Sequence, residues 1–377
     1  MNPTELRESM PTLDEVIYLN TGASAPLPRP VANAVQSCVA YHGYESPTDE
    51  GMYQCAFDVY DEARAAVAGL VGAQEPEIAL TQSTTDGINR IACASEWSAG
   101  DVIVTTDVEH PSGELPWRRL TELRGVEVRV VETDHGHLDP AAVADVLDED
   151  VRLVSLSATD WEYGRRLPVD AVTDLAHDVG ARVLVDAVQA VGQRPVDVHE
   201  WGADFVAAAG HKWLLGPWGA GFLFVREGSE EWLTPRQVGY RGIVPPDETP
   251  DDRAFAYKPG AQRLEVATAN PAPYAGLVEA IESATDTGIA ARMDRIEMLT
   301  DYLKSRLPDD RLLSPRDFHS GLVTVETDDA AGVVERLDDQ GVKVRVIPSI
   351  DSVRASVHAF NTREDLDRFV EGSGLLD

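Results

Sequence analysis

The chain has 377 residues, of which 65 are Asp or Glu and only 32 are Lys or Arg, so its formal net charge at pH 7 is −33. A charge of this sign and size repels nucleic-acid phosphates and anionic lipids, which excludes nucleic acid and membrane surfaces as expected partners. Hydrophobic residues make up 43% of the chain, so a folded core is expected, and we interpret the acidity as the solvated surface of a halophilic protein in a salt-rich cytosol.

The N-terminal segment and the cysteines predict a soluble, cytoplasmic protein. The first residues, MNPTELRESMPTLDEV, contain no apolar run preceded by positive charge, so no signal peptide is expected. No stretch approaches the roughly 20 apolar residues that a membrane-spanning helix needs. The three cysteines, Cys38, Cys55 and Cys93, form no CxxC pair and no metal-ligand spacing. We therefore expect reduced thiols and no metal site.

Seven short β-branched runs follow along the chain, and alanine-rich segments with helical periodicity separate several of them. The expected strands cover residues 77–82, 101–106, 126–132, 151–157, 182–188, 204–210 and 221–226. This alternation is typical of a mostly parallel sheet with helices on both faces. The sequence therefore predicts an α/β protein whose large domain, residues 15–255, contains a mainly parallel seven-stranded sheet.

A smaller α/β domain is expected after a connection rich in Pro and Asp at residues 242–260. A long helix-like run at about 271–307 leads into three further strands, at 321–327, 342–347 and 353–360. We assign residues 1–14 and 256–377 to this small domain.

Polar side chains lie directly after several strands of the expected large sheet. The carboxyl ends of parallel strands meet at one edge of a sheet, and ligands of α/β proteins bind at that edge. The residues expected there are Ser83–Thr85, His110, Trp161, Asp186–Gln189 and His211–Lys212.

Lys212 is unusual because the chain contains only four lysines, and small or apolar residues flank this one in AAAGHKWLLGPWGAGFLFV. Desolvation in such surroundings lowers the pKa of an amine and favours its nucleophilic neutral form. Asp186 ends the preceding expected strand and is placed to face the same pocket. Pyridoxal phosphate (PLP) requires two such residues: a lysine that forms a bond with its aldehyde, and an aspartate that faces its pyridinium nitrogen. A solvent-facing lysine and a capping aspartate remain the alternatives for each residue alone.

A phosphate site is expected in QSTTDGIN, which places Thr84 and Thr85 between a strand and a helix. Free backbone N–H groups and the helix dipole favour an anion at such a position, although an ordinary N-cap would have the same sequence. His110 follows the next strand, where an imidazole could stack on a flat ring.

The whole set resembles the class V aminotransferase family of fold-type I PLP enzymes, which includes cysteine desulfurases and isopenicillin-N-epimerase-like proteins. The resemblance extends from YLNTGASAPLP at 18–28 to VRASVHAFNTREDLDRF at 353–369. Its core is TTDGIN, EH, VDAVQ and GHKWLLGPWGAGFL, in the order and spacing of the family.

The resemblance implies a role for each residue toward the cofactor. Lys212 would attach PLP and later carry the proton, Asp186 would pair with the ring nitrogen, and Gln189 would bond the phenolic oxygen. His110 would stack on the ring. The residues implied as further cofactor contacts are Thr84, Thr85, His211 and Trp161.

Other implied roles concern the substrate and a second subunit. Thr268, in RLEVATAN, matches a residue that reaches the phosphate of the neighbouring subunit, which implies a homodimer with shared active sites. Arg354 matches the arginine that holds the substrate carboxylate, a task suited to a bidentate guanidinium. Arg345 and Ala23 lie in the matching segments and are assigned to substrate binding as well.

Three departures from the desulfurase pattern stand out. The loop RVIPSIDSVR (345–354) lacks the nucleophilic cysteine, and its Ser349 and Ser352 are poor substitutes without an activating base. Cys93 is interpreted as a buried structural thiol. Ala209 stands where relatives often have a hydroxyl, and Trp161 stands where desulfurases have a ring-contacting Asn. These changes favour the epimerase-like branch.

We therefore expect a PLP-dependent enzyme that acts on a small amino acid. Transamination with a 2-oxo acid is the leading prediction, a C–S or other β-lyase of the desulfurase-like kind is the next, and racemisation or epimerisation is the third. The rival from another class is a PLP-binding regulatory protein without turnover. The intact set of Lys212, Asp186 and Arg354 argues against that rival.

Overall fold

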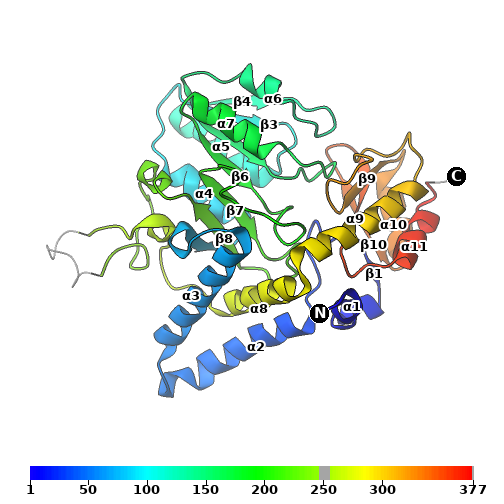
Figure 1. Cartoon of the computed structure of the whole chain (residues 1–377), viewed down its shortest axis with the longest axis horizontal. Coiled ribbons are helices and arrows are strands. Elements are labelled where there is room, and N and C mark those ends of the chain that lie inside the picture. The colour runs from blue at the N-terminus through cyan, green and yellow to red at the C-terminus, as the bar shows by residue number, and fades with distance from the viewer. Residues whose placement is uncertain (246–254, 376–377) are drawn as a thin grey trace.

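The computed structural model describes residues 1–245 and 255–375. Its large sheet and the helices on it form one part of the molecule, and the C-terminal elements form a smaller part beside it (Figure 1). Within the described residues, no helix is both long enough and apolar enough to cross a membrane.

The large sheet has seven strands, as predicted. They run in the order β2-β8-β7-β6-β5-β3-β4. Their bounds are β2 Ile78–Thr81, β3 Val102–Thr106, β4 Glu127–Val131, β5 Val151–Ser157, β6 Arg182–Asp186, β7 Phe205–Ala209 and β8 Gly221–Val225. The pairings of β3 with β4 and β5, of β5 with β6 and of β6 with β7 are parallel, whereas β8 is antiparallel to both β7 and β2. The mainly parallel α/β fold is therefore confirmed.

Helices cover both faces of this sheet, because its central strands are apolar on both sides. One face packs on α3 (Met52–Val71), α7 (Val169–Asp178) and α8 (Ala272–Thr287), through buried residues such as Val67, Val172 and Leu277. The other face packs on α4 (Thr84–Ala94) and α5 (Pro111–Arg124), through Ile91 and Trp117. The remaining helices of this part are α2 (Arg29–Tyr44) and the short α6 (Pro140–Ala144).

The smaller part is built on the antiparallel sheet β11-β12-β9. Its elements are α9 Ile289–Arg306, β9 Leu322–Glu326, α10 Ala330–Asp339, β10 Val342–Lys343, β11 Arg345–Ile347, β12 Ser352–Ser356 and α11 Arg363–Ser373. The N-terminal helix α1 (Pro3–Glu8) joins it, since Arg7 forms an ion pair with Asp365 at 2.8 Å.

The domain boundaries near residues 15 and 255 stay a prediction, and two packing contacts favour moving them. Strand β1 (Ile17–Tyr18) pairs with β10, and Leu19 lies in the core of the small domain. Helix α8, in contrast, belongs to the core of the large sheet, so the C-terminal boundary is better placed at Gly288, between α8 and α9.

Candidate active site

A cavity of about 350 Å³ lies at the carboxyl ends of the parallel strands. Most of the residues expected to meet at this edge do line it. The lining consists of Gly22, Ala23, Ser83, Thr84, Thr85, His110, Ser112, Trp161, Val188, Gln189, His211, Lys212, Trp218 and Arg345.

Lys212 follows β7 and presents an amine to this cavity. Burial lowers the pKa of Lys212 to about 8, against the opposing effect of the Asp186 carboxylate, and the charges of Arg354 and Arg345 lower it further. An amine with this pKa is partly neutral at pH 7, which is the form that attacks a carbonyl carbon.

Asp186 ends β6 and is 6% exposed. Its carboxylate accepts a hydrogen bond of 2.9 Å from the N–H of Val188. Burial raises the pKa of Asp186, while Lys212 lowers it, so the two charges lie close enough to interact. A buried carboxylate of this kind is suited to a protonated ring nitrogen.

The N-terminus of α4, where a phosphate site is predicted, lies at the cavity. Ser83 caps the helix by accepting a hydrogen bond from the N–H of Asp86, and Thr84 and Thr85 follow in the first turn. The hydroxyl of Thr84 is buried and has no hydrogen-bond partner among the described residues. Free N–H groups, a free hydroxyl and the positive end of the helix dipole together fit a phosphate group.

His110 caps α5 at the opposite wall of the cavity. Its Nδ1 accepts a hydrogen bond from the N–H of Ser112 at 3.2 Å, which leaves the hydrogen of the neutral ring on Nε2. Burial, with the charges of Lys212 and Arg345, lowers the pKa of His110 to about 4. The ring meets Trp161 edge to face at 5.3 Å. A neutral, flat imidazole is therefore available to stack on a planar cofactor.

Gln189 and His211 line the cavity on the side of the lysine. Gln189 donates to the carbonyl of Gly22 at 2.9 Å and accepts from the indole of Trp213 at 2.8 Å, so its second amide hydrogen is left for a ligand. Burial and the charge of Lys212 lower the pKa of His211 to about 4. The bond from Gln189 to a phenolic oxygen and the contact of His211 with phosphate stay predictions.

Arg354 and Arg345 lie opposite each other on the antiparallel pair β11–β12. Arg354 is fully buried and does not itself line the cavity, although its Nη2 lies close to Gly22, which does. It donates Nη1 to the carbonyl of Trp161, while its Nε and Nη2 have no partner among the described residues. The Arg345 guanidinium borders the cavity, 5.6 Å from the ring centroid of Trp161. Arg345 donates Nε to the carbonyl of Val346 at 3.3 Å, and Arg354 keeps two donors without a partner in the described part of the chain. These two guanidinium groups fit a carboxylate ligand.

Gly22 makes room for this arginine. A Cβ atom at residue 22 would lie 2.9 Å from Nη2 of Arg354 and 2.6 Å from Leu322. The neighbouring Ala23 also lines the cavity, in the segment assigned to substrate binding.

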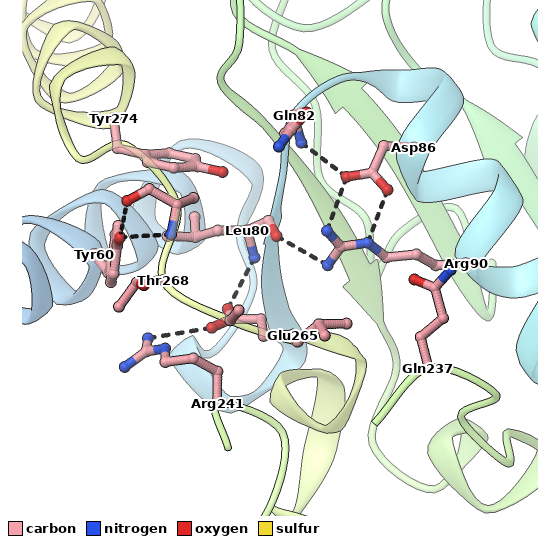
Figure 2. A pocket seen from close by; sticks show the side chains of 13 residues that line it. Tyr60, Leu80, Gln82, Asp86, Arg90, Gln237, Arg241, Glu265, Thr268 and Tyr274 are labelled. Carbon is pink, nitrogen blue, oxygen red and sulfur yellow. Dashed lines mark hydrogen bonds and ion pairs between the residues drawn. The ribbon is translucent and has the colours of Figure 1, made fainter. Parts of the chain in front are cut away.

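Thr268 does not line this cavity. It borders a second cavity of about 320 Å³, together with Arg241 and Glu265 (Figure 2). Its N–H donates to the hydroxyl of Tyr240 at 3.0 Å. The role of Thr268 at the phosphate of a neighbouring subunit, and the homodimer itself, stay predictions.

The thiols and the loop hydroxyls lie apart from the lysine. Cys93 is exposed on the outer face of α4, so the prediction of a buried thiol was wrong. Cys55 is buried and Cys38 is partly buried, and none of the three lines the cavity. Ser349 donates to the carboxylate of Glu162, so the hydroxyl does have a base beside it, contrary to the sequence-based expectation. Neither partner of that pair borders the cavity, however.

Two features of the site went unnoticed in the sequence. Trp218 lies within GPWGAG, and the sequence does not distinguish it from the rest of the motif. It is 70% exposed, lines the cavity and packs at a tilt on His211, with 4.6 Å between the ring centroids. Glu109 precedes His110 and is buried, with hydrogen bonds from Thr106 and Ser157. Burial raises the pKa of Glu109 to about 7.

Two further expectations from the sequence concern Ala209 and the absence of a metal site. Ala209 is buried at the end of β7 and carries no hydroxyl toward the phosphate cradle. Among the residues that the structure describes, no cluster of His, Cys, Asp or Glu could hold a metal ion.

This chain is similar to a known protein family, to named proteins and to solved structures. The family described as Aminotransferase class-V matches residues 17–369. A protein of Methanothermobacter thermautotrophicus named probable cysteine desulfurase is 32% identical over 97% of this chain and 96% of its own length. A solved structure of the cystine C–S lyase C-DES with its reaction product cysteine persulfide has a TM-score of 0.90 and 26% identity, over 97% of this chain and 99% of that one. A C-DES mutant with glycine covalently linked to its PLP cofactor has a TM-score of 0.91 and 26% identity, over 98% and 99% of the two chains.

Proposed function

This chain belongs to the Aminotransferase class-V family, and we propose that it is a C–S lyase that eliminates sulfur from a cysteine-derived amino acid. Its cofactor is PLP, as in the similar structure that carries this group. The observation that carries the proposal is the content of one cavity. The amine of Lys212, the neutral imidazole of His110 and the guanidinium of Arg345 line it, and none of the three cysteines does.

The geometry supplies each function that such a lyase needs. Bound PLP withdraws electrons from the Cα atom of an attached amino acid. The N–H groups at the start of α4 would hold its phosphate, and Asp186 would keep its ring nitrogen protonated. The free Nε and Nη2 of Arg354 bind the substrate carboxylate.

Lys212 then acts as the base. Burial of its amine, together with the positive charges of Arg354 and Arg345, lowers its pKa and keeps part of it neutral, so that it would remove the Cα proton. Departure of the thiol from Cβ, followed by hydrolysis, converts cysteine and water into pyruvate, ammonia and hydrogen sulfide. No protein thiol takes part.

A second candidate is cysteine desulfuration, because a relative bears that name. That reaction makes alanine and leaves the sulfur on a protein thiolate, which must reach the substrate. The absence of a cysteine from the cavity lining favours elimination over this reaction. Transamination, the leading prediction from the sequence, finds no support in the names of the relatives, which favour the lyase alternative.

Product analysis separates these candidates. The PLP-loaded protein is incubated with L-cysteine, and pyruvate, sulfide, alanine and protein-bound persulfide are quantified, with and without a 2-oxo acid. We expect pyruvate and sulfide in equal amounts, and neither from Lys212→Ala. Alanine formed in step with a persulfide would contradict the proposal, as would turnover that requires the 2-oxo acid. A protein that binds PLP and converts no amino acid would be the regulatory rival.

A further inference from the structure

The loop between β5 and α7, residues 160–166, is built around one buried carboxylate. Asp160 is 0% exposed. Its Oδ1 accepts from the N–H groups of Glu162 at 2.9 Å and Tyr163 at 2.6 Å, and its Oδ2 accepts from the N–H of Arg165 at 2.6 Å. The N–H of Asp160 in turn donates to the carbonyl of Arg165 at 2.9 Å. The carboxylate therefore closes the loop from inside.

The outer side of this loop is held by the small domain. Four successive carbonyl oxygens, of residues 161–164, each accept a hydrogen bond from a side chain of that domain. In chain order, the donors are Arg354, Thr324, Ser314 and Ser320. The first of these bonds occupies Nη1 of Arg354, the residue that we assign to the substrate carboxylate.

We propose that Asp160 is a positioning residue that holds the carbonyl of Trp161 against Arg354 and so sets the affinity of the site for a substrate carboxylate. The inference rests on the proposed function, because it takes Arg354 as the carboxylate ligand. Arg354 is fully buried and its remaining N–H groups have no other acceptor in the described chain, so the direction of its guanidinium depends on this one bond. A carbonyl displaced by a few tenths of an ångström redirects both free donors.

The loop also requires a carboxylate, not merely a polar side chain. Three N–H donors converge on the two oxygens of Asp160, and an amide offers only one acceptor oxygen. The space beside it is closed, since a Cβ at Gly136 would lie 2.7 Å from Oδ2. In Asp160→Asn, the side-chain amide N–H group would therefore face one of the backbone N–H donors. That buried hydrogen bond would be lost.

The test compares two ligands that differ only in the carboxylate. L-Cysteine and cysteamine, which lacks that group, are mixed with the PLP-loaded enzyme in a stopped-flow instrument. The dissociation constants are read from the amplitude of the rapid absorbance change of the bound cofactor, before turnover of cysteine begins. We expect the wild type to bind cysteine more tightly. In Asp160→Asn, cysteine binding should weaken about tenfold or more while cysteamine binding stays the same. The absorbance of the resting enzyme should not change.

Asp204→Asn is the matched control. Asp204 is also a buried carboxylate that accepts from a backbone N–H, that of Val183 at 2.9 Å, but it precedes β7 at the end of the sheet away from the cavity. This variant should lose stability and keep the cysteine-to-cysteamine ratio.

If Asp160→Asn does not fold, Ser314→Ala decides the question. This change releases the carbonyl of Tyr163 and the N–H of Thr324 and leaves the side chains of Asp160 and Arg354 unaltered, and it should lower the same ratio by a smaller factor. An unchanged ratio in the variants, or an equal loss of both ligands, would overturn the positioning role. Equal binding of the two ligands by the wild type would instead overturn the assignment of Arg354 and, with it, the proposed function.

Discussion

Lys212 occupies a locally positive region of a strongly acidic protein. The net charge is −33, yet the groups that lower the pKa of this amine include two arginines, and Asp186 alone opposes them. Neighbouring His110 and His211 are neutral at pH 7 because burial and the charge of Lys212 lower the pKa of each to about 4. The residue therefore combines nucleophilic reactivity with surroundings that attract anionic ligands.

Replacing Lys212 should abolish covalent capture of PLP and leave the fold intact. Lys212→Ala removes the amine, and Lys212→Arg should fail as well, because a guanidinium stays protonated and cannot attack an aldehyde. The absorbance of the protein-bound cofactor and mass spectrometry after borohydride reduction measure the capture, and thermal melting serves as the control for folding. A Lys212→Ala protein with a normal spectrum and normal turnover would contradict the assignment.

The rate of PLP capture by the apoprotein should depend on the pKa of about 8 of Lys212. Only the neutral amine reacts, so the rate should rise about tenfold between pH 6 and pH 7 and level off above pH 9. Asp186 raises this pKa, so Asp186→Asn should move the midpoint to lower pH. Stopped-flow absorbance against pH measures both profiles. A midpoint near 10, as for a free lysine, would show that the surroundings do not act on the amine.

At the scale of elements, the loops after β6 and β7 position the catalytic pair by packing backbone on backbone. Gly192, in the loop after β6, has a φ of +88°, and a Cβ there would lie 2.6 Å from the nitrogen of Leu214 and 2.7 Å from the carbonyl carbon of Trp213. The loop that carries Lys212 can approach the end of β6 this closely because residue 192 has no side chain.

Gly192→Ala should therefore lower the free energy of unfolding by roughly 3 kcal/mol and weaken PLP binding, because both the left-handed backbone and the contact are unfavourable. Gly180→Ala is the matched control: its φ is +83°, but a Cβ would meet nothing within 4 Å. Gly180→Ala should lower the free energy of unfolding by about 1 kcal/mol, because of the backbone conformation alone, and it should leave PLP binding unchanged. Urea unfolding and PLP titration measure the two effects. Equal losses in the two variants would argue against close loop packing.

At the scale of the whole molecule, the charge of −33 dominates the electrostatics. Like charges on a compact surface repel each other, and this repulsion is screened within about 10 Å at 0.1 M salt and within about 3 Å at 1 M. Because the charge is spread over a folded chain, the free energy of unfolding and any association between subunits should both increase with ionic strength.

The melting temperature should accordingly rise from dilute buffer to molar KCl, and the expected homodimer should dissociate in dilute buffer. Calorimetry and light scattering across a KCl series measure the two responses. A parallel series in sucrose separates screening from general exclusion of solute. A flat response to KCl would contradict the interpretation of the surface as halophilic.

The sequence by itself determined the seven strands and the residues that follow them. Lys212, Asp186 and Thr84 could be assigned from short motifs, because the carboxyl ends of parallel strands meet at one edge wherever the strands lie in the chain. Charge and composition are likewise independent of the fold. The reversal of β8 was not predicted, although the eleven residues between β7 and β8 are too few for the helical crossover that a parallel strand needs.

Only the tertiary structure decided the contacts between distant segments. Trp161 and Arg354 are 193 positions apart in the chain, and Ser349 and Glu162 are 187 apart, so no local pattern announces either pair. The same holds for Trp218 at the cavity and for Thr268 at a different one. The first two contacts arise from how the small domain docks on the loops of the sheet, and the other two from how loops of the large domain pack on one another. Packing of whole elements, not local sequence, fixes both arrangements.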